Sequence, residues 1–123
     1  MGPRDRDAAR KSLGREAEQL VARHLERRGF ALLARNARLG HLEIDLIARR
    51  GRLVVFCEVR ARTSDQTVSP AHTITPLKIF RLRRAAADWL RSARLGAVEV
   101  RFDAACVVFD APEGRLTYYE AAF

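Results

Sequence analysis

Two segments separated by a short turn constrain the fold of this chain more than any other feature of the sequence. Residues 42–47 alternate apolar and charged side chains, the pattern of a strand with one buried face. Residues 53–59 form a dense apolar run, typical of a strand that is covered on both faces. Arg50 and Gly51 between them predict a tight turn. We therefore expect a β-hairpin within a sheet that has other layers packed on it.

Helical signals flank this hairpin on both sides. Ser12 is expected to cap a first helix, which carries an apolar stripe and stops before Gly29. Thr75 and Pro76 have the residue types of a helix cap and a first helical position, and Gly96 is expected to end this second helix. Two long helices beside a sheet favour the α/β class.

Three further strands complete the predicted order of elements. Residues 30–34 are short and apolar, residues 98–110 alternate cleanly, and residues 116–119 resemble an edge strand. Residues 63–75 are polar and predict a loop. The expected order is helix, three strands, helix, two strands (αβββαββ), with a mixed sheet flanked by two main helices. Residues 1–12 predict a flexible basic tail, and residues 13–123 a single domain.

The charge balance points to a polyanionic partner. The 123 residues have a formal net charge of +8 and 31% charged side chains, which favours nucleic acid or another anionic surface. No apolar run is long enough to span a membrane and no signal peptide precedes the helix, so a cytoplasmic location with no membrane partner is expected. Cys57 and Cys106 lack zinc-ligand spacing and are interpreted as buried thiols.

Three acids within the apolar strands need an explanation, because a buried charge is costly unless it is paired or bound to a metal. If Arg50 and Gly51 form a two-residue loop, Glu43 faces Glu58, and Asp45 becomes the diagonal neighbour of Glu58 on the same face. Carboxylate oxygens at this spacing suit Mg²⁺ or Mn²⁺. An ordinary salt-bridge network with nearby arginines remains the alternative at this point.

Several short blocks together resemble the YraN family, a bacterial family of small proteins with an endonuclease-like fold. The blocks are Gly14-x-Glu16-Ala17, Gly29-Phe30, Asn36-x-Arg38, Glu43-Ile-Asp45-Leu-Ile-Ala48 and Phe56-x-Glu58-Val-Arg60-x-Arg62. The resemblance covers roughly residues 13–90. It implies a restriction-endonuclease-like core related to Holliday-junction resolvases and to the PD-(D/E)XK nucleases.

The resemblance also implies roles for individual residues. Asp45 and Glu58 match the two motif acids that ligate the metal, and Glu16 matches a helical acid that resolvases use beside it. Arg60 stands where the family has a catalytic lysine, and arginine stabilises charge but does not act as a base at neutral pH. Lys78, near the start of the second helix, is a candidate to reach the site from another element. The expected catalytic residues are thus Glu16, Asp45, Glu58 and Arg60.

Two hypotheses about function follow from these residues, and a third also stays open, an assembly factor that binds a protein partner through its sheet edge or C-terminal hairpin. The first is a metal-dependent endonuclease that acts on structured or branched DNA. The second is a non-catalytic nucleic-acid-binding module that retains the nuclease fold. In either case, phosphate contacts are expected from a set of basic side chains: Arg35, Arg38, Arg62, Lys78, Arg81 and Arg84. A homodimer is an expectation that comes only from the resolvase-like relatives.

Overall fold

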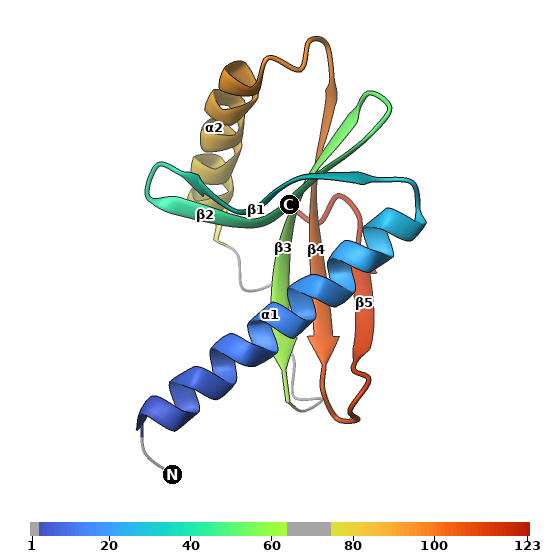
Figure 1. Ribbon diagram of the computed structural model, residues 1–123. Helices are drawn as coiled ribbons and strands as arrows, with labels where there is room; N and C mark the ends of the chain where they lie inside the picture. Colours follow the sequence, from blue (N-terminus) through green and yellow to red (C-terminus); the bar gives the residue numbers. More distant parts are fainter. Residues whose placement is uncertain (1–2, 64–74) are drawn as a thin grey trace.

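The structure, a computed structural model, describes residues 3–63 and 75–123. These residues form two helices and five strands (Figure 1). In chain order, the elements are α1 (Pro3–Arg27), β1 (Ala31–Leu39), β2 (Leu42–Arg50), β3 (Leu53–Arg62), α2 (Pro76–Ala93), β4 (Glu99–Val108) and β5 (Arg115–Tyr119). The loop predicted at residues 63–75 lies almost entirely outside the described residues.

The five strands form one mixed sheet in the order β1-β2-β3-β4-β5. Neighbouring strands are antiparallel except β3 and β4, which are parallel. Parallel neighbours need a long crossover connection, and α2 lies within the segment that joins them. The predicted α/β class, with a mixed sheet, two main helices and this order of elements, is confirmed.

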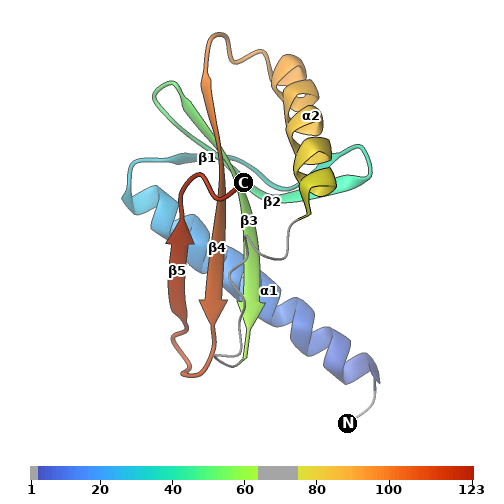
Figure 2. The same cartoon turned by 180° about the vertical axis from the view of Figure 1, so that it is seen from behind.

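The helices cover opposite faces of the sheet, as Figures 1 and 2 show from the two sides. On one face, Val21 and Leu25 of α1 belong to the same buried cluster as Val55 of β3. On the other face, Leu82 of α2 packs in a cluster with Phe56. Since successive side chains of β3 enter different cores, its sequence reads as a continuous apolar run.

The first helix begins at Pro3, so the predicted start at Ser12 was wrong. Proline suits a first helical position. Alanine, arginine and lysine in this stretch are good helix formers. The tail predicted for residues 1–12 is therefore helical from Pro3 onward, and residues 1–2 lie outside the described part of the chain.

The second helix has the predicted cap. Thr75 is extended, its hydroxyl accepts a hydrogen bond from the backbone N–H of Lys78 (3.2 Å), and Pro76 takes the first helical position. The helix ends earlier than Gly96, because Arg94 already adopts the left-handed conformation with φ of 52°. Both ends of α2 are thus fixed by local backbone geometry.

The hairpin between β2 and β3 turns one residue later than predicted. Arg50 pairs with Leu53, so the two loop residues are Gly51 and Arg52. Gly51 has φ of +59° at the first loop position, where tight hairpin turns favour glycine. The register moves by one residue on each strand, and Phe56 pairs with Ile47 rather than with Asp45. The two strands are therefore displaced relative to each other by two residues. Since side chains alternate between the faces of a strand, a displacement by an even number leaves each side chain on its predicted face.

β2 bends sharply at Asp45. Leu46 lies in the cluster under α1, whereas Ile44, two residues away, lies in the cluster under α2. On β1, Asn36 is opposite this point, between the pairs Arg35–Leu46 and Ala37–Ile44, and has a left-handed φ of 50°. Asparagine tolerates that conformation better than most residues. The bend carries the tip of the β1–β2 hairpin across to α2, as Figure 1 shows.

Candidate functional site

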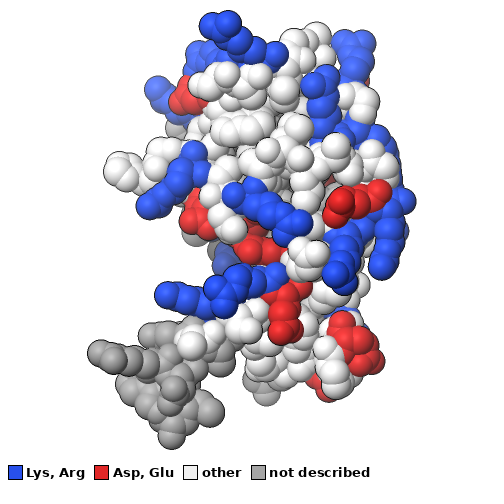
Figure 3. Space-filling view, viewed as in Figure 1, with Lys and Arg blue, Asp and Glu red and all other residues white. Residues whose placement is uncertain are grey.

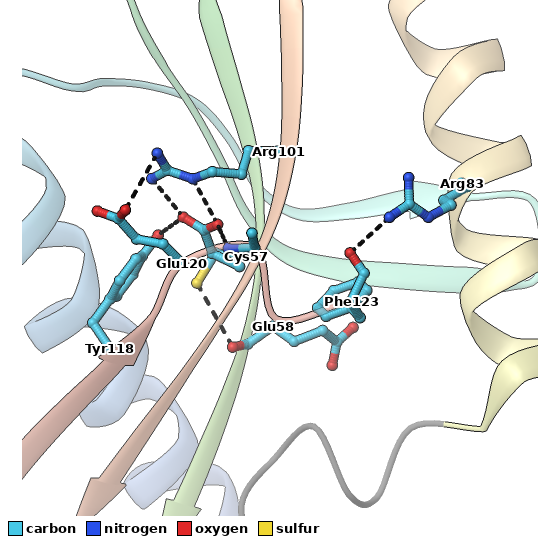
Figure 4. A network of polar contacts seen from close by, with 9 residues as sticks. Cys57, Glu58, Arg83, Arg101, Tyr118, Glu120 and Phe123 are labelled. Carbon is cyan, nitrogen blue, oxygen red and sulfur yellow. Dashed lines mark hydrogen bonds and ion pairs between the residues drawn. The ribbon is translucent and has the colours of Figure 1, made fainter.

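Asp45 and Glu58 lie together where β2 bends away from β3. The last residue pair of the β2–β3 ladder is Leu46–Cys57. Beyond this pair, a side chain of β2, that of Asp45, accepts a hydrogen bond from the backbone of β3. Asp45 Oδ2 accepts a hydrogen bond of 2.7 Å from the N–H of Val59, the residue after Glu58. The Glu58 side chain points to the side of β3 opposite to Cys57 (Figure 4) and is only 6% exposed. The bend therefore places one carboxylate on each of two neighbouring strands at a single point.

A third and a fourth carboxylate approach this point from α1 and β2. With its nitrogen directed toward them, the Asn36 amide donates to Glu18 Oε1 at 2.8 Å and to Glu43 Oε1 at 3.2 Å. The negative charges of Asp45 and Glu43 both raise the pKa of Glu18, which shows that the three groups are close in space. The residue that bends β1 thus also holds two of the acids.

The structure does not bring Glu16 to these carboxylates. Glu16 is exposed and lies beside Leu13, Phe109 and Pro112, near the turn between β4 and β5. Two residues along a helix correspond to a rotation of about 200°, so Glu16 and Glu18 point in nearly opposite directions. Sequence reasoning chose the wrong acid of α1 for contact with the cluster and missed Glu18.

Two cations offset this concentration of negative charge. Arg60 and Lys78 each lower the pKa values of both Asp45 and Glu58. Arg60 is two residues beyond Glu58 on β3, and Lys78 comes from the first turn of α2. The Arg60 Nε is buried and makes no hydrogen bond with the residues that the structure describes, so a donor is left without an acceptor beside the acids.

Burial is the largest cause of a raised pKa at each of three acids, Glu18, Asp45 and Glu58. For Glu58 the next cause is the charge of Asp45, and for Asp45 the charge of Glu43 adds to the effect. The hydrogen bond from Val59 lowers the pKa of Asp45 but does not outweigh burial. Acids with pKa values raised by burial and by one another are typical of sites that bind a cation or perform chemistry.

These shifts predict how stability depends on pH when divalent ions are absent. A carboxyl with a raised pKa in the folded protein holds its proton where the unfolded chain has lost it, so the free energy of unfolding falls as pH rises. The window begins near the ordinary carboxyl values of 3.8 for Asp45 and 4.5 for Glu58 and extends upward. Urea unfolding in EDTA across this window should show a steeper fall for the wild type than for Asp45→Asn. Equal slopes in the two proteins would contradict the shared burial of these acids. The pKa of His24 is lowered, which makes the free energy of unfolding rise with pH. This contribution is the same in both proteins and does not affect the comparison.

The predicted phosphate contacts fall into separate groups. Arg35 on β1 donates to the Gln19 side chain of α1 at 2.9 Å, and Arg62 donates to the backbone oxygen of Ala61 at the far end of β3. Arg81 and Arg84 are exposed on α2 and line a groove with the β1–β2 tip. Arg38, also exposed, lies on the other side of the tip. In the face shown in Figure 3, basic side chains surround smaller acidic patches.

A second polar cluster lies under the opposite side of the sheet. Asp103 of β4 is fully buried and accepts hydrogen bonds from Arg101 (2.8 and 2.9 Å), from the Tyr118 hydroxyl (2.5 Å) and from the N–H of Ala121 (2.9 Å). Figure 4 shows Arg101 and Tyr118 converging from neighbouring strands, with Glu120 beside them. Every donor here comes from the protein itself, which indicates a structural role that the alternating pattern of β4 did not reveal.

Neither a complete metal cage nor a membrane span is present in residues 3–63 and 75–123. In this part of the chain, no three side chains of His, Cys, Asp or Glu are close enough to hold a metal ion by themselves. No helix there combines the length and the apolar character needed to cross a membrane. Any cation at Asp45 and Glu58 would therefore need further oxygen ligands from water or from a bound molecule.

Comparison with known proteins places these residues in a widespread sequence group. Residues 17–107 match the model described as "Uncharacterised protein family UPF0102". A UPF0102 protein of Anaeromyxobacter dehalogenans (strain 2CP-C) is 44% identical over 116 residues, which cover 93% of this chain and 85% of that protein. One from Pelotomaculum thermopropionicum is 42% identical over 120 residues, 94% of this chain and 98% of that protein.

Among solved structures, the chain is distantly similar to SfsA of Pyrococcus furiosus in complex with Ca²⁺. The TM-score is 0.31 and the sequence identity 16%, and the match covers 89% of this chain. The chain spans 61% of the length of that protein.

Proposed function

We propose that this chain, which belongs to the UPF0102 family, is a divalent-metal-dependent endonuclease that cleaves structured or branched DNA. The observation that supports this most is that Asp45 of β2 and Glu58 of β3 lie together, with Glu18 of α1 close to Asp45, and that burial raises the pKa values of all three. DNA with a branch is the substrate class implied by the resemblance to Holliday-junction resolvases.

The donor set fits Mg²⁺ or Mn²⁺. These ions prefer carboxylate oxygens, and Mg²⁺ is usually held by one or two carboxylates plus water and substrate phosphate rather than by a full protein cage. Asp45 and Glu58 would supply the two carboxylates, and Glu18, steadied by Asn36, would orient a water at the edge of the site. When bound, such an ion neutralises charge on the phosphodiester and lowers the pKa of water.

Arg60 and Lys78 together would perform the functions of the lysine that the family has at the position of Arg60. Arg60 stays charged at neutral pH, and its buried Nε without a partner suits a phosphate oxygen of the strand being cut. Lys78, whose charge acts on both Asp45 and Glu58, can give a proton to the departing oxygen or hold the attacking water by hydrogen bonds. The replacement of lysine by Arg60 is therefore compatible with turnover.

The experiment compares cleavage of end-labelled four-way junctions, flaps, duplexes and single strands with Mn²⁺ or Mg²⁺. Cutting of a branched substrate that requires the ion and is lost in Asp45→Asn supports the nuclease. The alternative is a nucleic-acid-binding module without turnover, favoured by Arg60 and by the absence of a third close ligand among the described residues. It predicts salt-sensitive binding that is unchanged in Asp45→Asn, and no cutting.

The two acids of α1 provide a matched pair of variants. Glu18→Gln is expected to lower the cleavage rate by about 10- to 100-fold, the usual effect of losing a partner that orients a metal site. Glu16→Gln makes the same chemical change two residues away, on an exposed surface remote from Asp45, and should leave the rate within about twofold of wild type. Equal losses in both variants, or a loss only in Glu16→Gln, would overturn the assignment of Glu18.

A further inference from the structure

The solvent face of α2 combines apolar and cationic side chains. Leu77 is 56% exposed and Phe80 61%, and Phe80 is the most exposed large apolar side chain in the described residues. Arg81 and Arg84 follow at positions that lie on the same helical face, since residues three, four and seven apart are neighbours. We call Leu77, Phe80, Arg81 and Arg84 the α2 stripe.

The cations of the stripe are not engaged within the described structure. The other two arginines of α2 are occupied: Arg83 donates to the backbone oxygen of Phe123 (2.9 Å) and lies over the ring of Phe102, and Arg91 pairs with Asp88. Arg81 and Arg84 make no hydrogen bond or ion pair with residues 3–63 or 75–123. They are therefore available to an external anion.

A groove runs beside these two arginines. It has a volume of about 390 Å³ and lies between α2 and the tip of the β1–β2 hairpin, where His41 also lines it. Its acidic residue, Asp88, is already paired with Arg91. A chain of phosphates would meet two guanidinium groups here, each able to bind a phosphate in a bidentate manner.

The stripe starts in the same turn of α2 as Lys78. Lys78, whose charge lowers the pKa values of Asp45 and Glu58, is the residue next to Leu77 in the first turn of α2. Phe80 is two residues further, which corresponds to a rise of about 3 Å and a rotation of about 200°, so its ring points to the side of α2 away from Lys78. Arg81, three residues after Lys78, is the member of the stripe that neighbours Lys78 on the helix surface. A strand that leaves Asp45 and Glu58 past Lys78 would meet Arg81 next, and the exposed ring of Phe80 lies beside Arg81 and Arg84. An exposed aromatic ring with cations beside it suits single-stranded nucleic acid, which binds by base stacking and phosphate contact.

A second copy of this chain fits the stripe poorly. A two-fold dimer through Leu77 and Phe80 uses one patch twice, so Arg81 and Arg84 of both copies would lie in one interface, and the stripe contains no acidic residue to pair with them. Like charges brought together in this way are unfavourable. Charge complementarity therefore favours a polyanion as the occupant.

We propose that Phe80 stacks on an unpaired base of the nucleic acid, while Arg81 and Arg84 hold phosphates of the same strand in the groove. This inference deepens the proposed function, because it makes an unstacked base, as at a branch or a flap, the feature that the protein selects. Fully paired duplex offers no free base face to Phe80 and would be bound through phosphates alone.

The test measures binding in EDTA, so that no strand is cut. The probes are a duplex with one unpaired 2-aminopurine and the same duplex fully paired. Phe80→Ala should weaken binding to the unpaired probe by about 10-fold and raise the fluorescence of the bound 2-aminopurine, since a stacked base is quenched. Phe80→Trp should retain both properties. Leu33→Ala, an exposed apolar change on β1 outside the stripe, should behave as wild type.

Two outcomes would overturn the proposal. One is a Phe80→Ala variant with unchanged affinity and fluorescence on the unpaired probe, or with equal losses on both probes. The other is a wild-type protein that sediments as a dimer without nucleic acid while the Phe80→Ala variant sediments as a monomer. That result would assign the stripe to a second copy of the chain. Failure of the nuclease proposal is seen separately, as absence of cutting with Mn²⁺ by a wild-type protein that still quenches 2-aminopurine through Phe80.

Discussion

Asp45→Asn is expected to reduce metal-dependent cleavage by about 10³-fold, which corresponds to about 4 kcal/mol of transition-state stabilisation. Asparagine keeps the shape of the side chain, and its amide oxygen can still accept the hydrogen bond from the N–H of Val59. The bend in β2 should therefore persist, while the charge that attracts the cation is removed. Single-turnover cleavage of a labelled junction at saturating protein measures the change.

The control for this loss is the stability of the variant itself. Because Asp45 raises the pKa of buried Glu58, its neutral replacement should leave the urea midpoint at neutral pH unchanged or higher. Loss of cleavage together with a midpoint at or above that of wild type assigns the effect to chemistry rather than to unfolding. A variant that keeps more than about a tenth of the wild-type rate would refute a metal-ligand role for Asp45.

Asp103→Ala is expected to cost about 3–5 kcal/mol of folding free energy, the usual penalty for removing one partner of a buried ion pair. The substitution would leave the Tyr118 hydroxyl and the N–H of Ala121 without their acceptor, and Arg101 would retain, among the described residues, only its longer ion pair with Glu120 (3.8 Å). Equilibrium urea unfolding followed by circular dichroism measures the loss. Molecules that remain folded should still cleave, because Asp103 lies in a different cluster from Asp45 and Glu58.

The contrast for this prediction is an exposed ion pair. Asp110 and Arg115 are 2.5 Å apart at the surface, and Asp110→Ala should shift the urea midpoint only slightly, because exposed pairs contribute little. If Asp103→Ala proved as mild as Asp110→Ala, the buried network would not be the anchor that ties β5 and the last residues to β4.

The periodic features of the sequence predicted the fold well. Alternation in β2 and the apolar run in β3 gave the hairpin, and Thr75 with Pro76 gave the start of α2. The strand positions of Asp45 and Glu58 predicted that they meet, although the assumed turn was one residue too early. That error did not change the predicted faces, because one residue on each strand adds up to a relative displacement of two residues, and side chains alternate with a period of two. The resemblance to the YraN family is likewise confirmed, because UPF0102 is the YraN family.

Features that depend on tertiary packing could not be predicted. Glu16 and Glu18 flank Ala17 of the buried α1 stripe symmetrically, so the choice between them depends on which side β2 occupies, and nothing local encodes this. The same holds for Asp103, which alternation grouped with polar neighbours but which the packing of β5 buries. The bend at Asn36 carries a weak signal, since asparagine is one of the few residues that tolerate a left-handed φ.

The central claim is that the carboxylates of Asp45 and Glu58 share one divalent cation. Calorimetric titration of the wild-type protein with Mn²⁺, alone and with a junction oligonucleotide, tests it most directly. The account predicts one site per chain that tightens with the oligonucleotide, is lost in Asp45→Asn and survives in Glu16→Gln. Heat from neither titration, or identical binding in Asp45→Asn and wild type, would contradict it.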